Sequence, residues 1–589
     1  MQNIFIKLSF VFIWVFSLNV FAQQGVTVIS LTVDDNTPWH VHAPGMAWTV
    51  DVTPSLAVDT INDLLQGIDP RLTYQWFDHL GNPLGEKTTV DSDIIKNGET
   101  FHVNSPANPQ IGWYGLRFVC DNPAAILKDY FPKEPRTWGF AVMELHSSTY
   151  RTANLANNFG LTHNNADDPY IGGIDKNMSA NTDYAAMQTK ANSLWNQGLW
   201  SMPLIGNRYP WSSIRTEDGS GFMHVPDEKH LADLKEFAKN ISAINYVRMW
   251  EFGLEENLGG NYFGGKEKEN YYMINTLPKL LKAASEGFAE GNLLRTDRGK
   301  AQICYQIAEP NGRRADVTRF LESEAAQYVD VLSLHPYQWP SFPDPDYWMQ
   351  DMMDFVHREI ARTGNSHLEI WFTEVGAPEH GAYRDPDGDP KKDQYFGYNG
   401  DEWNTQGGGV QNNGVPSRFY ATYVSKLLAL MFNKGVTGAS WYCYKDRSSN
   451  RSYPEDWFGM IDYLRFPKPA YLAFHESQEH LMAAEPKGLF RIGNVLVSSY
   501  KKADNNVFVM WLEQDDQGLG AYDPARWKDF EGWSYENINK TPQFVTWEQL
   551  GIAGAPVRAV NMLGTPIEIS DGVTVGVDPV YVIAIDVKP

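Results

Sequence analysis

Short apolar runs alternate with helical patterns between about residue 138 and residue 474, and nearly every run ends in a polar side chain. Between most runs lie helix-spaced apolar residues, such as Leu234, Phe237 and Ile241. This alternation predicts an α/β fold, a (β/α)8 TIM barrel. A doubly wound open sheet is the alternative, but it gives no reason for the polar run ends. The eight runs are GFAVMEL, NNFGLTHN, LWSMPLIGN, YVRMWEFG, AQICYQIAE, VDVLSLHPY, LEIWFTEVG and GASWYCYKD.

The sequences on both sides of this region have a different hydrophobic pattern. Residues 25–137 and 475–589 contain short alternating runs separated by turns, which is typical of β-sandwich domains. In the second flank, residues 503–506 predict the turn of a hairpin. The expected domains are therefore an N-terminal sandwich, the barrel over 138–474 and a C-terminal sandwich.

The N-terminus and the charge balance limit where the protein acts and what it binds. Residues 1–22 read as a signal peptide, with Lys7 before an apolar stretch and Val20-Phe21-Ala22 at the cleavage site. We therefore expect a secreted or periplasmic protein with no membrane span after cleavage. The net charge of −23 argues against nucleic acid as a partner. The three cysteines predict neither a disulfide framework nor a zinc site.

Polar residues at strand ends are where a barrel builds its active site, because the C-terminal ends of its strands converge on one face. Two carboxyl groups across such a mouth can hydrolyse a glycosidic bond, and retaining enzymes hold them about 5 to 5.5 Å apart. Glu255 follows the fourth run and Glu374 ends the seventh. The other polar run ends are His163, Asn207, Arg208, Glu309, His335, Tyr337, Lys445 and Asp446.

The runs that carry these two glutamates resemble motifs of clan A glycoside hydrolases, especially families 39 and 51. WEFGLEEN resembles their strand-four motif and WFTEVG their strand-seven motif, while LSLHPY resembles the strand-six H-x-Y. WFGMIDYLRFPKPAYLAF is similar to the segment after strand eight, and the resemblance covers roughly residues 138–589. It implies a retaining enzyme with Glu255 as acid/base and Glu374 as nucleophile, and with His335 and Tyr337 lining the catalytic subsite.

Residues near Glu255 leave alternatives open. Glu256 is a rival acid if the loop bulges and is otherwise expected at the rim, while Glu251 is expected to make an inner hydrogen bond within the strand. One residue departs from the family pattern, because Leu254 stands where these families usually carry an Asn that binds the sugar 2-hydroxyl. The departure indicates a sugar without a free 2-hydroxyl, one substituted there, or a contact from another residue.

The substrate clues favour a plant or algal polysaccharide or its oligosaccharides, anionic or sulfated. Arg208, Lys445 and Arg447 can meet sulfate or carboxylate groups, or can instead be ion-pair partners of acidic residues. We expect no cofactor, and a calcium ion at the DPDGDP stretch, residues 385–390, is a weak alternative. Some of the tryptophans near the mouth are expected to stack on sugars and the rest to be core; of Trp211, Trp339, Trp403, Trp441 and Trp457, those expected to bind substrate are Trp339, Trp403 and Trp441.

Two other functions compete with this reading. The first is an endo-acting agarase- or porphyranase-like hydrolase of the same clan. The second is a carbohydrate-binding barrel without activity, which the Leu254 departure favours and the two motif glutamates disfavour.

Overall fold

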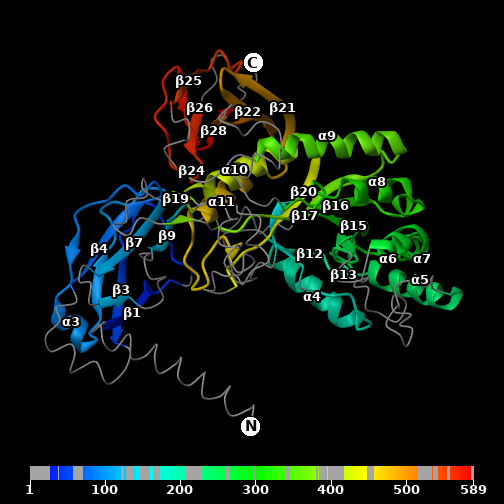
Figure 1. The fold of residues 1–589 in the computed structure, drawn as a ribbon, viewed down its shortest axis with the longest axis horizontal. Coiled ribbons are helices and arrows are strands. Elements are labelled where there is room, and N and C mark those ends of the chain that lie inside the picture. The colour runs from blue at the N-terminus through cyan, green and yellow to red at the C-terminus, as the bar shows by residue number, and fades with distance from the viewer. Residues whose placement is uncertain are drawn as a thin grey trace, which may run out of the picture.

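The protein is described here from a computed structural model (Figure 1). The residues that it describes are 27–37, 39–56, 71–120, 125–127, 137–144, 159–162, 173–176, 178–205, 227–258, 266–297, 299–337, 345–379, 382–383, 394–395, 417–447, 457–513, 533–534, 541–552 and 557–585.

Two β-sheets share one hydrophobic core at the N-terminal side, drawn in blue in Figure 1. Val52 of one sheet and Phe118 and Phe140 of the other are all fully buried in that core. The four-stranded sheet has the order β6 (Phe101–Asn104), β3 (Thr49–Leu56), β1 (Thr27–Asp34) and β8 (Ala125–Leu127). The five-stranded sheet has the order β2 (Val41–His42), β9 (Thr137–Val142), β7 (Gly112–Cys120), β4 (Leu72–Asp78) and β5 (Thr88–Thr89), and α3 covers Ser92–Asn97.

The central region is a nine-stranded sheet in which every neighbouring pair is parallel. Its two outermost strands, β12 and β13, belong to one short run of the chain, residues 200–205. Ser201 of β12 also bridges Val247, just before β14. The order is β12 (Trp200–Ser201), β11 (Gly173–Asp175), β10 (Phe159–Thr162), β20 (Val436–Trp441), β17 (Glu369–Val375), β16 (Val331–His335), β15 (Gln302–Ala308), β14 (Met249–Phe252) and β13 (Leu204–Ile205).

Helices separate most of these strands in the chain and bury an apolar face against them. In α5 the Asp227 side chain accepts a hydrogen bond from the backbone N–H of His230 at 2.8 Å, which caps the first turn. Leu234, Phe237 and Ile241 are then buried at helical spacing, as predicted. The helices are α4 (Tyr184–Asn196), α5 (Glu228–Ser242), α6 (Lys266–Tyr271), the π-helix η1 (Tyr272–Thr276), α7 (Leu277–Asn292), α8 (Arg314–Glu322), the 3-10 helix η2 (Glu324–Tyr328), α9 (Asp346–Thr363), α10 (Ser417–Asn433) and α11 (Pro469–Leu481).

One expectation about the strands was wrong. The run GFAVMEL, assigned on sequence to the central region, supplies the last four residues of β9, which pairs antiparallel with β7 in the N-terminal sheets. The strand missed on sequence is β11, only three residues long. The loss of GFAVMEL before β10 is balanced by the gain of β11 after it, so β14 and β17 keep their predicted fourth and seventh places along the chain when β12 and β13 count as one run.

The C-terminal strands, drawn in orange and red, form a second pair of sheets around their own core (Figure 1). The predicted hairpin is confirmed, because β22 and β23 pair antiparallel up to Lys502 and Asn505. The five-stranded sheet has the order β21 (Glu485–Ile492), β22 (Val495–Lys502), β23 (Asn505–Leu512), β28 (Val580–Ile585) and β26 (Val557–Asn561). β25 (Gln543–Thr546) pairs with β27 (Gly572–Val575), and a separate small sheet joins β18 (Ala382–Tyr383), β19 (Gln394–Tyr395) and β24 (Trp533–Ser534).

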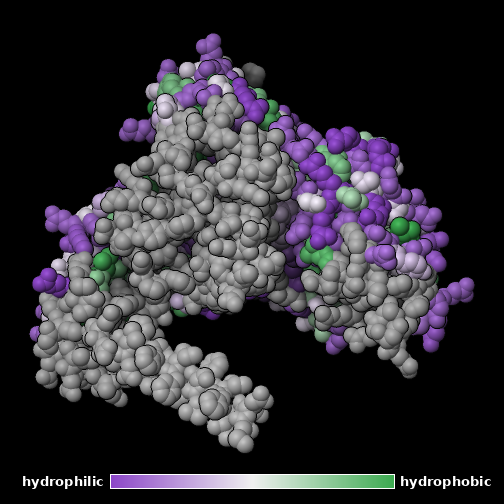
Figure 2. All heavy atoms as spheres, in the orientation of Figure 1, coloured by the Kyte–Doolittle hydropathy of each residue, from purple (hydrophilic) through white to green (hydrophobic). Residues whose placement is uncertain are grey.

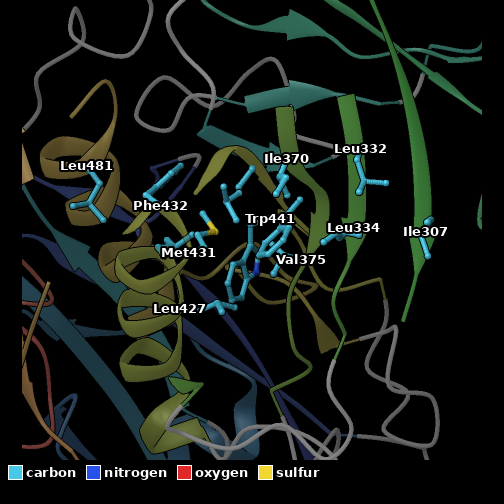
Figure 3. Packing of buried hydrophobic residues seen from close by; sticks show 14 of the residues in the cluster. Ile307, Leu332, Leu334, Ile370, Val375, Leu427, Met431, Phe432, Trp441 and Leu481 are labelled. Carbon is cyan, nitrogen blue, oxygen red and sulfur yellow. The ribbon is translucent and has the colours of Figure 1, made fainter. Parts of the chain in front are cut away.

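The main core lies between the central strands and the helices (Figure 3). Figure 3 shows side chains of the strands, such as Leu334 and Val375, near Leu427 and Met431 of α10. The described surface on the side seen in Figure 2 is mostly hydrophilic, with isolated hydrophobic residues. Among the described residues, no helix combines the length and the apolar character that a membrane crossing needs.

The N-terminal sheets contact the segment that leads into α11. Trp113 of β7 donates its indole N–H to the backbone oxygen of Pro467 at 2.7 Å. The neighbouring Phe466 is buried in the N-terminal core and stacks on His40, with ring centroids 3.8 Å apart. Gly139 of β9 makes this approach possible, because a Cβ there would lie 2.0 Å from Pro467 O.

We expect Gly139→Ala to destabilise this contact by about 1 to 3 kcal/mol, the usual cost of forcing an extra methyl group into packed structure. Thermal unfolding and limited proteolysis would measure the loss. Gly576→Ala is the matched control, because a Cβ at Gly576 meets no atom within 4 Å. Equal melting temperatures for the two variants would contradict the expectation.

Candidate active site

A sharp turn at the end of β14 positions Glu255. Gly253 has a φ of 74°, and a Cβ there would lie 2.5 Å from Cδ of Glu256, so the turn requires glycine. Gln306 of β15 donates its side-chain amide to Gly253 O at 2.5 Å. Glu255 itself has a φ of 48°, a left-handed conformation that is uncommon for a residue other than glycine. The surrounding contacts therefore hold this glutamate in a strained backbone position.

His335, the last residue of β16, connects the two predicted catalytic glutamates. Its Nδ1 lies 2.9 Å from Glu255 Oε1 and 3.7 Å from Glu374 Oε2. One carboxylate oxygen of Glu255 and one of Glu374 lie within 4.8 Å of each other and of a ring nitrogen of His335. The structure thus brings together Glu255, Glu374 and His335, which lie far apart in the sequence.

Tyr337 supports Glu374 from the same strand end. Its hydroxyl donates to Glu374 Oε2 at 3.1 Å. The Tyr337 ring meets those of Phe458 and Tyr442 edge-on, at centroid distances of 5.6 and 6.5 Å. Of the site residues expected to line the subsite, His335 and Tyr337 therefore both contact a predicted catalytic glutamate.

Lys176 belongs to this cluster, and the sequence analysis missed it. It follows β11 directly, and its Nζ lies 2.9 Å from Glu374 Oε1 and 2.9 Å from Glu251 Oε2. It also donates to the backbone oxygen of Thr373 at 3.3 Å. The Lys176 side chain is only 6% exposed, so both ion pairs are formed away from bulk water.

Glu251 forms the base of the cluster, as the expectation of an inner hydrogen bond predicted. It is fully buried in β14 and accepts a hydrogen bond from the Thr373 hydroxyl. Because Thr373 gives its only proton to Glu251, His335 Nε2, at 3.0 Å from Thr373 Oγ1, must donate to it. A hydrogen-bonded chain therefore runs from Glu255 through His335 and Thr373 to Glu251.

The charges within the cluster set its protonation. Burial raises the pKa of Glu251, but Lys176 and His335 outweigh it and lower that pKa to about 2. Burial also raises the pKa of Glu374, and the charges of Lys176 and His335 bring it below its ordinary value. Burial lowers the pKa of His335, whereas the charge of Glu374 and hydrogen bonds to Glu251 and Glu255 raise it to about 9. Near neutral pH, Glu251 and Glu374 are thus ionised and His335 is cationic.

A second buried ion cluster supports the loops after β17 and β20. Lys468 Nζ lies 2.8 Å from Asp446 Oδ1 and 2.9 Å from Glu379 Oε2. Asp446 also accepts from the backbone N–H of Gly459 at 2.8 Å. Burial is the main cause that raises the pKa of Asp446 to about 7. The cluster ties the two loops to the segment that meets the N-terminal sheets at Pro467.

Some predicted site residues have other positions. Trp441 is fully buried in the main core beside Val375 (Figure 3), so the expectation that it binds sugar was wrong. Its place in the last central strand, where the chain packs against α10, explains the burial. Lys445 follows that strand and bridges Ile461 through its backbone. The remaining predicted residues lie outside the described parts of the chain, namely His163, Asn207, Arg208, Trp339 and Trp403, as do Trp211 and the DPDGDP stretch.

The two other acidic residues near the mouth differ from each other. Glu256 was expected at the rim, but it is buried and accepts a hydrogen bond from the Tyr272 hydroxyl at 3.0 Å. The π-helix η1 begins at Tyr272 and so supplies this partner. From the sequence, Glu309 could lie either at the rim or in the site. It is half-exposed and pairs with Arg313 at 3.3 Å.

Glu255, His335 and Glu374 form the single group among the described residues whose donor atoms are close enough to share a metal ion. Their hydrogen bonds favour another use. Lys176 and Tyr337 each donate to a different oxygen of Glu374, and His335 Nε2 donates to Thr373. The group is therefore built around a hydrogen-bonded carboxylate rather than around a cation.

We expect Glu251→Gln to lose stability in a pH-dependent way. The folded pKa of Glu251 is about 2, below the ordinary 4.5, so its ionised form stabilises the fold above pH 4.5. That contribution is lost as the pH falls from about 4.5 to about 2, and one pKa unit corresponds to about 1.4 kcal/mol.

The melting temperatures of wild type and Glu251→Gln should therefore differ most near pH 7 and converge toward pH 2. Thermal unfolding across this range measures the difference. Glu309→Gln, at the end of a neighbouring strand, is the control and should follow the wild type. A constant gap between wild type and Glu251→Gln at all pH values would contradict the expectation.

Comparison with known proteins shows a shared fold. No protein-family model matches the sequence, and no curated protein matches it. Among solved structures, a family 39 glycoside hydrolase from Bacteroides cellulosilyticus WH2 aligns with a TM-score of 0.54 and 13% identity, over 94% of this chain and 100% of that one. A GH30 endoxylanase from Clostridium papyrosolvens C71 aligns with a TM-score of 0.40 and 10% identity, over 70% of this chain and 89% of that one.

A β-glucuronidase from Bacteroides uniformis aligns with a TM-score of 0.33 and 10% identity, over 93% of this chain and 60% of that one. The last two similarities are too weak to carry an argument. The first extends along nearly all of both chains. The protein therefore shares the fold of the family 39 glycoside hydrolase from Bacteroides cellulosilyticus WH2.

Proposed function

We propose that the protein is a retaining glycoside hydrolase in which Glu374 is the nucleophile and Glu255 the acid/base. The observation that carries the proposal is the short separation of the two carboxylates, whose nearest oxygens lie within 4.8 Å. Retaining enzymes hold their carboxyl groups about 5 to 5.5 Å apart, whereas inverting enzymes need about 6.5 to 9.5 Å to fit a water molecule. The fold shared with a family 39 glycoside hydrolase supports the same reaction class.

The proposed architecture is a TIM barrel between two β-sandwich domains. Residues 200–205 supply both outermost strands of the parallel sheet, β12 and β13. Because one run of the chain forms both edges, this supports closure of the sheet into an eight-stranded barrel. The pairs of sheets at either end support the two sandwiches, with the first boundary after β9 rather than at 137.

The reaction follows from the protonation of the cluster. Glu374 is ionised, so it can attack the anomeric carbon while the glycosidic C–O bond breaks and Glu255 gives a proton to the leaving oxygen. Because Glu255 Oε1 accepts from cationic His335, the transferable proton belongs on Oε2. In the second step Glu255 takes a proton from water, the water oxygen bonds to the anomeric carbon, and the ester bond to Glu374 breaks.

Alanine variants with azide as an added nucleophile would test the two assignments. Glu374→Ala should release no sugar from an aryl glycoside, but azide can enter the emptied space and give a glycosyl azide of inverted configuration. Glu255→Ala should form the glycosyl-enzyme from a substrate with a good leaving group, and azide should then give the retained configuration. Proton NMR of the products distinguishes the two anomers.

Glu309→Ala serves as the control for this test, since that residue pairs with Arg313 at the rim. It should keep wild-type rates and form no azide product. Activity of Glu374→Ala without azide, on any substrate that wild type cleaves, would overturn the assignment. So would the same product anomer from both variants.

The proposed substrate is a plant or algal polysaccharide, or an oligosaccharide from it, that is anionic or sulfated. Leu254 supports this class, because it is 36% exposed beside Glu255 and offers no hydrogen bond to a sugar 2-hydroxyl. Arg447 also supports it, since its guanidinium lies 5.6 Å from the centroid of the Tyr442 ring, which in turn lies 6.5 Å from the ring of Tyr337. The apolar N-terminal stretch supports export, to a secreted or periplasmic location.

We expect Leu254→Asn to shift specificity toward sugars with a free 2-hydroxyl, because the amide can bind a group whose hydrogen bond strengthens in the transition state. The kcat/KM for an unsubstituted aryl xyloside should rise by about tenfold, with a smaller or opposite change for a 2-sulfated substrate. Leu254→Met is the matched control and should leave the ratio unchanged. Wild-type specificity in Leu254→Asn would contradict the role assigned to Leu254.

A further inference from the structure

Lys176 has no role in the sequence motifs, yet it contacts the proposed nucleophile directly. Its Nζ contacts Glu251 Oε2, Glu374 Oε1 and Thr373 O, at 2.9, 2.9 and 3.3 Å. The contacts with Glu374 and Thr373 are hydrogen bonds, and the contact with Glu251 is an ion pair. The group is therefore held in one place, between a buried carboxylate and the more accessible one of Glu374, whose side chain is 15% exposed.

The two carboxylates that share this lysine are not equivalent. Glu251 is fully buried and also accepts a hydrogen bond from Thr373, so its carboxylate is fixed inside the protein. Glu374 lies at the strand end and faces His335 and Tyr337 through its other oxygen. Lys176 thus binds Oε1 of Glu374, while Oε2 lies on the side of His335 and Glu255.

We propose that Lys176, with Glu251 as its counter-ion, is a positioning residue that keeps Glu374 ionised and directs its Oε2 toward the reacting carbon. The inference rests on the proposed function of Glu374. Its consequence is a division of labour, in which Glu251 keeps the buried lysine charged and the lysine prepares the nucleophile.

The electrostatics of the site support this division. The pKa of Lys176 is lowered by burial but raised above its ordinary value by the charges of Glu251 and Glu374. Without Lys176, burial and the charge of Glu251 would both raise the pKa of Glu374. Within the described part of the chain, the titratable groups that face Glu374 are Lys176, Glu251, Glu255, His335 and Tyr337.

The test removes the ion pair as a unit. Lys176→Met alone would leave Glu251 buried without its cation and could prevent folding, so the variant is Lys176→Met with Glu251→Gln. In it, the acid limb of the pH profile of kcat/KM should rise, because Lys176 lowers the pKa of Glu374 more than Glu251 raises it. The rise should be smaller than the roughly 1 to 3 pH units that an adjacent cation alone gives, since the charge of Glu251 is removed as well. The basic limb should move less, because Lys176 does not contact Glu255.

A second readout does not depend on activity. A water-soluble carbodiimide couples an added amine to protonated carboxyl groups, and mass spectrometry of the peptide fragments locates the product at Glu374. The pH at which this labelling is half-maximal should rise in the double variant by the same amount as the acid limb. An unchanged midpoint in a folded double variant would overturn the inference.

Two controls separate the lysine from its surroundings. Glu251→Gln alone leaves Lys176 with Glu374, so its acid limb and labelling midpoint should stay or fall; a rise as large as in the double variant would overturn the role of Lys176. Lys190→Met removes a neighbouring lysine that pairs with Asp175 at 3.5 Å, and it should leave both readouts unchanged.

The two proposals fail in different ways. If the labelling midpoint shifts but Glu374→Ala keeps its activity without azide, the pairing stands and the nucleophile assignment falls. If Glu374→Ala is rescued by azide but neither readout shifts, the function stands and the role of Lys176 falls.

Discussion

The cluster at the ends of β14, β16 and β17 depends most on the ammonium group of Lys176, which lies between two carboxylates. Burying a charge is costly unless partners surround it, and Lys176 is matched on both sides, by Glu251 and by Glu374. Removing Lys176 would leave the two carboxylates without the cation that they share. The ion-pair network therefore links β11, β14 and β17, which are not hydrogen-bonded neighbours in the sheet.

The parts of the site that could be predicted were those with local sequence patterns. Apolar runs with a carboxylate in or just after them located β14 and β17 correctly, and the resemblance of WEFGLEEN to a strand-four motif selected Glu255 over its neighbours. Lys176 had no such pattern, because β11 is only three residues long and too short to show a period. A lysine directly after an Ile-Asp pair gave no sign that it would be buried.

Other errors arose because tertiary contacts decide burial and strand partners. Residues 139–142 look the same whether they pair with β7 or with a central strand, since both settings bury a continuous apolar run. Glu256 looked like a rim residue because two acidic residues in a turn are usually solvated. Tyr272, sixteen positions later, has a buried hydroxyl that donates a hydrogen bond to Glu256. Trp441 could not be assigned to core or mouth until the position of α10 was known.

The contact between Trp113 and Pro467 has a consequence for how this architecture can change. Pro467 is next to Lys468, which forms ion pairs with the loops after β17 and β20, so the N-terminal sheets and these two loops share one short stretch of backbone. A gene fusion that exchanged the N-terminal part for another module would have to reproduce the glycine and the indole at that stretch. The two parts are therefore expected to have been inherited together.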